Sequence, residues 1–267
     1  MRPEAQRESV LDVAVLLSVG RHPVTGRARR ADQDARGVEL ALALDRAHLT
    51  LLHAGPRDEE SEGALRGYLG MGIPALTLIE QPPGADVIPA LAARLNEAGA
   101  QLVIAGERAE QGEGSGMLPY LLAERLGWPL VGGLAAVEKV ENGVATLLQA
   151  LPRGQRRRLQ VRLPAIVTVD AAAAAARQSA FGPARRGEIE AESAVVEWDE
   201  VQAEWSVAPA RKRPKRLKIV KAASARDRFK AAAAKAEGGS GQVLNDVTPE
   251  QGAEAIFKLL KDEGVLR

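Results

Sequence analysis

The sequence predicts an α/β protein with a doubly wound, mostly parallel sheet, an edge hairpin, and an extended C-terminal arm that ends in a helix. Two observations predict this class. Short β-branched or leucine-rich runs alternate with stretches of helical spacing, as in parallel strands joined by crossover helices. Aromatic residues make up only 3% of the chain, so the core must consist of Ala, Val, Leu and Ile. The predicted strands span residues 11–17, 48–52, 75–79 and 102–105.

Each predicted helix between these strands shows one apolar side. Asp86 stands directly before the third helix and is expected to cap its amino end. The apolar positions are Val38 and Leu42 in the first helix, Ala64, Leu65 and Leu69 in the second, and Val87, Leu91 and Leu95 in the third.

The pattern changes after Gly132 to further strand-like segments. Residues 144–149 and 158–162 are separated by the turn sequence PRGQ, and residues 165–169 follow. The first two segments predict a hairpin at an edge of the sheet.

Beyond Asp170 the regular pattern fades, which predicts an extended arm. Residues 188–204 are acidic, and residues 211–221 (RKRPKRLKIVK) are strongly basic. We expect a nucleotide-binding domain at 1–190 and a C-terminal arm with a terminal helix at 191–267.

The terminal helix is predicted by a capping box, TPEQ, at residues 248–251 with Pro at the first helical position. Gly264 is expected to end it. Its apolar stripe needs a surface to cover it, and that surface can belong to another chain. The stripe consists of Ala253, Ile256, Phe257 and Leu260.

Composition limits the class of protein. A chain of 267 residues with 46% hydrophobic residues can bury a core of one large or two small domains. The absence of cysteine excludes disulfides, thiolate metal sites and cysteine nucleophiles, and fits a reducing compartment. The apolar run near the N-terminus is too short for a secretory signal or a membrane span, so a cytoplasmic protein without membrane insertion is expected.

The loop GERAEQGEGSGMLP, residues 106–119, matches none of four established site motifs. It lacks the lysine of a P-loop and the third glycine of a dinucleotide fingerprint. It also lacks the glycine that a hydrolase turn needs two residues before Ser115, where Glu113 stands, and its acids are not spaced for calcium. Two interpretations remain: glycine amides and a Ser115-capped helix that bind an anion, or a plain loop whose glycines permit positive φ.

No catalytic or metal site is predicted. His22, His48 and His53 pair with no serine and have no ligand spacing, so each is more typical of a surface or turn position. The basic run at 211–221 contains a proline and no interleaved aromatics, which favours a solvated or partner-facing segment over a nucleic-acid contact.

Several sequence blocks, in order, resemble the β subunit of electron transfer flavoprotein. VAVLLSVGRHPVTG, from residue 13, resembles the family's VAVK-x-VPDT block, and ADQDARGVELALAL, from residue 31, its NPFDE-x-A-x-E-x-AL block. LLHAGP, from residue 51, is similar to the VSVGP turn, and ALRGYLGMGIPALTLI, from residue 64, to ALRxALAMGADRAIxI.

The remaining blocks cover the second half of the domain. GERAEQGEGSGMLPYLLAERLGWP, from residue 106, is similar to GKQAIDGDxGQVGPMLAELLGWP, with one extra residue. LQVRLPAIVTVD, from residue 159, is similar to VEVPLPAVVTVD, and RQSAFGPARRG, from residue 177, stands where the family has R-Y-x-[ST]-LPNIMKAKKK.

The resemblance implies a Rossmann-like, adenine-nucleotide-binding domain in a heterodimer. Its α subunit carries the redox-active FAD, and the β subunit supports it and buries AMP. Electrons would come from flavin-dependent dehydrogenases and pass toward a quinone-linked oxidoreductase, without catalytic residues from this chain. By the same resemblance the AMP site would consist of Ala14, Ala31, Asp32, Gln33, Asp34, Ala54, Gly106, Gly112, Gly114, Ser115 and Gly116.

Three acids, Glu107, Glu110 and Glu113, stand in the loop expected to face the phosphate and would repel it. The pocket can therefore hold AMP, a second flavin, or no ligand.

The family's partner-recognition loop corresponds to AARQSAFGPARR at residues 175–186. This resemblance makes Phe181 the partner anchor, with Arg177 ahead of it and Arg185 and Arg186 steering acidic partners. The alternative is that Phe181 packs back on its own domain.

Two other classes of function stay open. One is a stand-alone nucleotide-binding regulator with the same layered fold, which would need neither the arm nor the recognition loop. The other is a nucleic-acid binder that uses residues 211–221.

Overall fold

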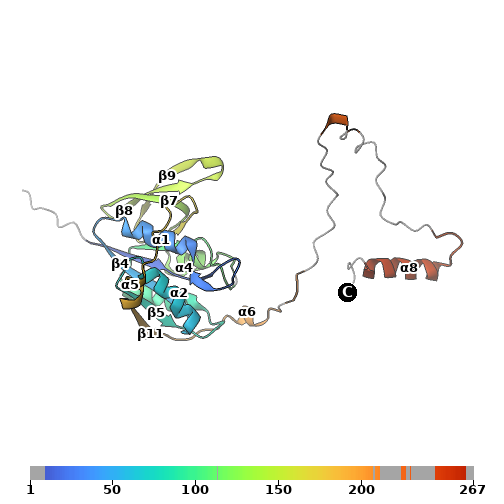
Figure 1. Cartoon of the computed structure of the whole chain (residues 1–267), viewed down its shortest axis with the longest axis horizontal. Coiled ribbons are helices and arrows are strands. Elements are labelled where there is room, and N and C mark those ends of the chain that lie inside the picture. Colours follow the sequence, from blue (N-terminus) through green and yellow to red (C-terminus); the bar gives the residue numbers. More distant parts are fainter. Residues whose placement is uncertain are drawn as a thin grey trace, which may run out of the picture. The chain divides into compact units, whose positions relative to one another are not determined.

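A nine-stranded sheet in the order β11-β5-β4-β1-β6-β10-β7-β8-β9 forms the centre of the first of two compact units (Figure 1). The units comprise residues 1–204 and 205–267, and each is described by itself. The computed structural model describes residues 10–112, 114–206, 208–210, 224–226, 229 and 244–262. The strands are β1 Leu11–Leu16, β4 Ala47–Gly55, β5 Ala75–Glu80, β6 Leu102–Gly106, β7 Leu130–Glu141, β8 Val144–Ala150, β9 Arg156–Arg162, β10 Ala165–Val169 and β11 Glu188–Ser193.

Strand pairing confirms a mostly parallel, doubly wound sheet with an edge hairpin. The pairs from β11 across to β7 are parallel, whereas β7–β8 and β8–β9 are antiparallel. The chain moves from β1 outward through β4 and β5, and then returns to β6 on the other side of β1. The strand order therefore reverses between β1 and β6, and ligands of such folds bind outside the carboxyl ends of the strands at this switch point.

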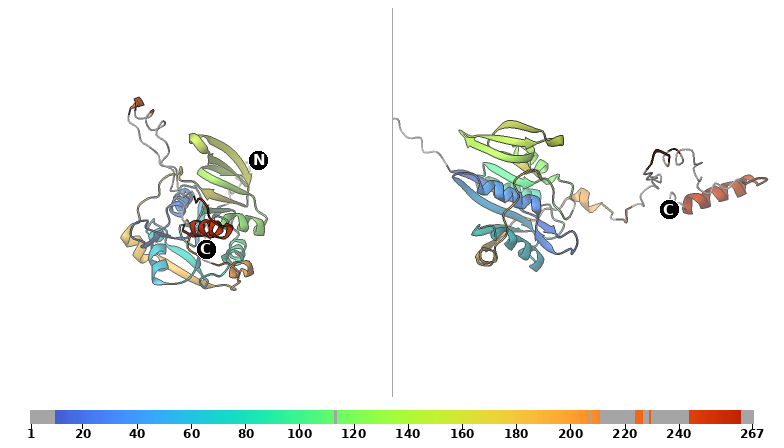
Figure 2. Two further views of the ribbon diagram at one scale, coloured as in Figure 1. Left: turned by 90° about the vertical axis from the view of Figure 1, so that its right-hand side faces the viewer. Right: turned by 45° about the horizontal axis from the view of Figure 1, so that its top comes forward.

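Helices cover both faces of the sheet (Figure 2). One apolar cluster joins Val13 and Val15 of β1 to the helices α1 and α2, and a second joins Ala14 and Leu16 to α3 and α4. Alternate residues of the same strand therefore serve opposite faces. The helices are α1 Asp32–Leu42, α2 Glu59–Leu69, α3 Val87–Glu97, α4 Leu118–Leu126, α5 Phe181–Arg186 and α6 Glu200–Ala203, with a 3-10 turn, η1, at Pro152–Gly154.

Two predicted helix caps are confirmed and one is wrong. The Asp86 carboxylate accepts a hydrogen bond from the Ile88 amide at the start of α3. In the capping box, Thr248 and Gln251 exchange side-chain to backbone hydrogen bonds at the start of α8, Pro249–Asp262. Ser115 does not cap α4, because that helix begins at Leu118 and Met117 is its N-cap residue.

Regular structure extends further than the sequence pattern indicates. Past Asp170, where an arm is expected, the chain forms α5 and then β11, which pairs along β5. A small hairpin of β2, Val19–Arg21, and β3, Ala28–Arg30, also follows β1. The basic run 211–221 and Gly264 lie outside the described residues. No helix in the described ranges is long and apolar enough to cross a membrane.

Candidate functional site

The carboxyl ends of β1 and β6 carry the segments that form the switch-point site. The chain leaves β1 through Ser18 into the β2–β3 hairpin and then enters α1. It leaves β6 at Gly106 into the glycine loop, residues 107–117, and then enters α4. Hydrogen bonds between these two excursions define the geometry of the site.

Asp34 is the central buried group of the site. Its carboxylate accepts hydrogen bonds from the Ser18 amide, at 2.6 Å, and from the Ser18 hydroxyl. Burial raises the pKa of Asp34 to about 6, even though hydrogen bonds from Ser18 and Gly106 favour the charged form. A Cβ on Gly106 would lie 2.2 Å from Asp34 Oδ1, so only glycine lets this carboxylate approach β6.

Tyr68 of α2 fixes the entrance to α1. Its hydroxyl accepts a hydrogen bond from the Ala31 amide and donates one to the Ser18 carbonyl, both at 2.7 Å. Ala31 is the N-cap residue of α1 and has no side-chain cap of its own. The tyrosine therefore holds the end of β1 and the start of α1 together.

Glu110 of the glycine loop occupies the amino end of α1. Its carboxylate accepts hydrogen bonds from the amides of Asp32, at 3.1 Å, and Arg21, at 3.0 Å. The same carboxylate forms an ion pair of 3.0 Å with the Arg29 guanidinium. The chain thus supplies its own anion to the positive end of this helix, where a phosphate would otherwise be favoured.

Gln33 ties the first residues of the glycine loop to α1. Its side-chain oxygen accepts hydrogen bonds from the amides of Glu107, at 3.1 Å, and Arg108, at 3.4 Å. These two amides are therefore engaged within the chain.

The later part of the loop offers amides that are not engaged. No hydrogen bond joins the amides of Gly114, Ser115 or Gly116 to another described residue. The Ser115 hydroxyl accepts from the Met117 amide, and Gly112, Gly114 and Gly116 all have positive φ. A Cβ on Gly116 would lie 2.7 Å from the Glu107 carbonyl oxygen, so the loop closes on itself here. Free amides at left-handed glycines form concavities that bind anions.

The expected adenine side of the site is apolar. Ala14 is 1% exposed inside the cluster of the α3 and α4 face, and Ala54 packs at the edge of that cluster. Next to Ala54, the buried side chains of His53 and Gln81 keep polar atoms without hydrogen-bond partners among the described residues. Burial lowers the pKa of His53, and its Nδ1 lies 2.8 Å from the Leu17 carbonyl oxygen. Buried polar atoms of this kind usually have a partner.

The structure brings some predicted site residues into contact and leaves others apart. Asp34 meets Gly106, Gln33 meets the start of the glycine loop, and Asp32 meets Glu110. Ala14 lies within the core on the other face of β1. Sequence reasoning missed Ser18, Tyr68 and Arg29. Ser18 follows a strand, Tyr68 lies in an apolar helical stripe and Arg29 lies in a short basic strand, and none of these positions gives a distinctive pattern.

The predicted partner segment lies on the surface of the first unit. Phe181, at the start of α5, is 79% exposed, so in this chain it does not pack back on its own domain. Arg185 and Arg186 are exposed in the last turn of α5. The Arg177 guanidinium forms a two-pronged contact with Glu39 and lowers the pKa of that carboxyl.

In the second unit, the apolar stripe of α8 includes side chains that are exposed. Ile256 is 61% exposed and Phe257 is 58% exposed.

Comparison with known proteins places this arrangement in a family. Residues 17–197 match the family model described as electron transfer flavoprotein domain. This span contains the switch-point site and α5, so the fold and the site define an electron transfer flavoprotein domain. A curated protein from Chromohalobacter salexigens, named electron transfer flavoprotein subunit beta, is 71% identical over 267 residues, which is 100% of both chains. The chain belongs to the β subunits of the electron transfer flavoprotein family.

Proposed function

We propose that this chain works in a heterodimeric electron transfer flavoprotein that accepts electrons from flavin-dependent dehydrogenases and passes them toward a quinone-linked acceptor. In this proposal FAD is held mainly by the α subunit and supplies the electron transfer when bound. The observation that carries the proposal is Phe181, a large apolar side chain 79% exposed on a short surface helix. A side chain of this kind stabilises a complex when it enters a partner's pocket.

The proposed contact with the α subunit uses the chain after β11. Exposed apolar side chains gather there, including Val195, Trp198 and Val201 before residue 204 and Ile256 and Phe257 in α8. Scattered apolar residues are ordinary on a surface, but a series of them along one terminal segment is typical of an interface.

Co-expression with an α subunit tests this assignment. The expected result is a yellow 1:1 complex that persists through size exclusion. A colourless monomer would instead favour the stand-alone regulator, and retention on DNA that salt abolishes would favour a nucleic-acid binder.

We propose AMP as the ligand of the switch-point site, with its phosphate at the amides of Gly114, Ser115 and Gly116. Support comes from the lack of hydrogen bonds between those amides and the other described residues. The amino end of α1 is not assigned to the phosphate, because Glu110 already binds there. A purine ring would lie against Ala54, close to the unpartnered polar atoms of Gln81.

Denaturing the purified complex and analysing the supernatant by chromatography tests this ligand. About one adenylate per chain is expected, since a buried ligand survives purification. Release of FAD alone, with no adenylate, would refute AMP.

The proposed dehydrogenase contact is tested by Phe181→Ala. Truncating an anchor of this kind costs about 2 kcal/mol or more, so reduction of the complex by the dehydrogenase should need about 30-fold more complex for half-maximal rate. FAD content should stay the same. An unchanged rate of reduction would show that Phe181 is not the anchor.

A further inference from the structure

The segment that presents Phe181 cannot hold its conformation alone. α5 has six residues and no side-chain cap at Ala180. Helices of this length are not stable in isolation. Its position must therefore come from the elements on which it lies.

α2 is the platform under α5. The Ala180 amide donates a 2.9 Å hydrogen bond to the Gly70 carbonyl, which directly follows α2. At the other end of α5, a Cβ on Gly187 would lie 2.9 Å from Leu69 Cβ, so the chain passes α2 with no space for a side chain. Both ends of α5 are thus held by the last turn of one helix.

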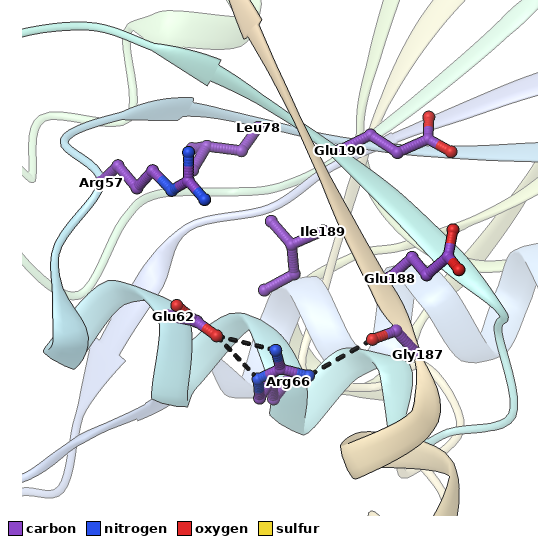
Figure 3. Close-up of a pocket in the computed structure, with 8 residues that line it drawn as sticks. All are labelled: Arg57, Glu62, Arg66, Leu78, Gly187, Glu188, Ile189 and Glu190. Atoms are coloured by element: carbon purple, nitrogen blue, oxygen red, sulfur yellow. Dashed lines mark hydrogen bonds and ion pairs between the residues drawn. The ribbon is translucent and has the colours of Figure 1, made fainter.

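Arg66 connects the two helices through its guanidinium (Figure 3). Its Nε and Nη2 donate to the Glu62 carboxylate of the same helix at 3.0 and 2.7 Å. Its Nη1 donates to the carbonyls of Ala184, at 3.2 Å, and Gly187, at 3.3 Å. These carbonyls belong to the last turn of α5 and the residue that follows it, where a positive charge is favoured.

The same side chain lines a cavity of about 350 Å³ between α2 and β11. Arg57 lines it as well, but its guanidinium pairs with Glu80 and not with α5. The two arginines therefore line the same cavity and each carries one positive charge. They differ in that only Arg66 contacts α5.

We propose that Arg66 is a positioning residue that fixes α5 and, through it, the exposed side chain of Phe181 for docking. The inference rests on the proposed function of Phe181 as the partner anchor. Phe181 stays exposed in this arrangement, so the contacts of Arg66 do not bury it. They act on the backbone of α5 and thereby hold the anchor in one position. Preorganisation of this kind lowers the entropy lost on binding.

The test compares Arg66→Met, Arg66→Lys and the matched control Arg57→Met in the complex with the α subunit. Reduction by a flavin-dependent dehydrogenase that accepts the wild-type complex is measured, together with FAD content. Arg66→Met should raise KM about tenfold, as expected for loss of a hydrogen bond from a charged group, with kcat and FAD content unchanged. Arg66→Lys should lie in between, because an ammonium lacks the fork that reaches Glu62 and α5 together. Arg57→Met should match wild type.

A double variant and hydrogen exchange separate positioning from a general structural role. If Arg66 acts through Phe181, then Arg66→Met should add nothing in a Phe181→Ala background. Amides of residues 181–187 should exchange faster in Arg66→Met but not in Arg57→Met. If Arg66→Met prevents assembly with the α subunit, the same measurements are made with Arg66→Lys in its place.

Equal KM values for Arg66→Met and Arg57→Met, or additive effects in the double variant, would overturn the inference. If Phe181→Ala alone changes nothing, the docking proposal fails, and hydrogen exchange still decides whether Arg66 holds α5. Unchanged exchange at residues 181–187 would then overturn the inference too.

Discussion

At the scale of single residues, the site is organised by a carboxyl group that faces inward. The sequence placed Asp34 and Gly106 in one site, and the structure joins them through a contact only glycine allows. Ser18 and Tyr68 could not be predicted, because their roles depend on where β1 and α2 end in space. Asp34 is therefore supported by groups from three elements, and its ionisation is linked to folding.

Asp34→Asn should change how stability depends on pH. The folded pKa of Asp34 is raised from 3.8 to about 6, so the folded chain binds this proton more tightly than the unfolded chain does. The stability that the carboxyl contributes is present at low pH and is lost as pH rises through about 6. With these two pKa values, the free energy of unfolding of wild type relative to Asp34→Asn should fall by about 2 kcal/mol between pH 4 and pH 7.

Urea denaturation across that range measures the effect. Asp45→Asn removes a carboxylate at an exposed position after α1 and is the matched control for the loss of a charge. A constant difference between wild type and Asp34→Asn would contradict the burial argument.

At the scale of elements, regular alternation predicted the central strands and the β8–β9 hairpin, but it missed the edge strand β11. The central strands are mostly apolar because both faces of the sheet are covered there, and β6 is apolar throughout. β11 is an edge strand that pairs with β5 and has the sequence EIEAES. Its charged residues do not give the apolar pattern of a strand, so it was not predicted. Ser115 seemed the cap of α4, but the loop closes at Gly116 and the helix starts later.

Glu110 connects the glycine loop to α1. From the sequence alone, Glu110 was interpreted only as a charge that repels phosphate. Glu110→Gln should lower the free energy of unfolding by about 1 kcal/mol, because the amide loses the ion pair with Arg29 and one accepting oxygen. Amides at the start of the loop should exchange faster. Glu107→Gln in the same loop is the control, since only its backbone is engaged by Gln33. Thermal unfolding and hydrogen exchange measure these effects. Equal behaviour of Glu110→Gln and Glu107→Gln would show that the Glu110 side chain does not hold the loop on α1.

At the scale of the whole molecule, the chain consists of two compact units with different contents. Residues 1–204 contain the sheet, the switch-point site and α5, whereas the second unit contains α8 with its exposed apolar stripe. Periodicity predicted the central parallel strands and α8, including the capping box that starts this helix. The partner that covers the stripe cannot be derived from this chain, because an apolar helix face specifies burial and not what buries it.

Phe257→Ala should separate folding of the first unit from assembly with the α subunit. Phe257 is 58% exposed, so its removal should leave the thermal unfolding of the isolated chain unchanged. If the stripe packs on the α subunit, the dissociation constant of the complex should rise at least about tenfold, the usual effect of truncating a buried aromatic at an interface. Lys258→Ala, on the opposite side of α8, is the matched control and should bind as wild type does. Isothermal titration of purified subunits distinguishes these outcomes, and equal affinities for both variants would mean that another part of the chain carries the interface.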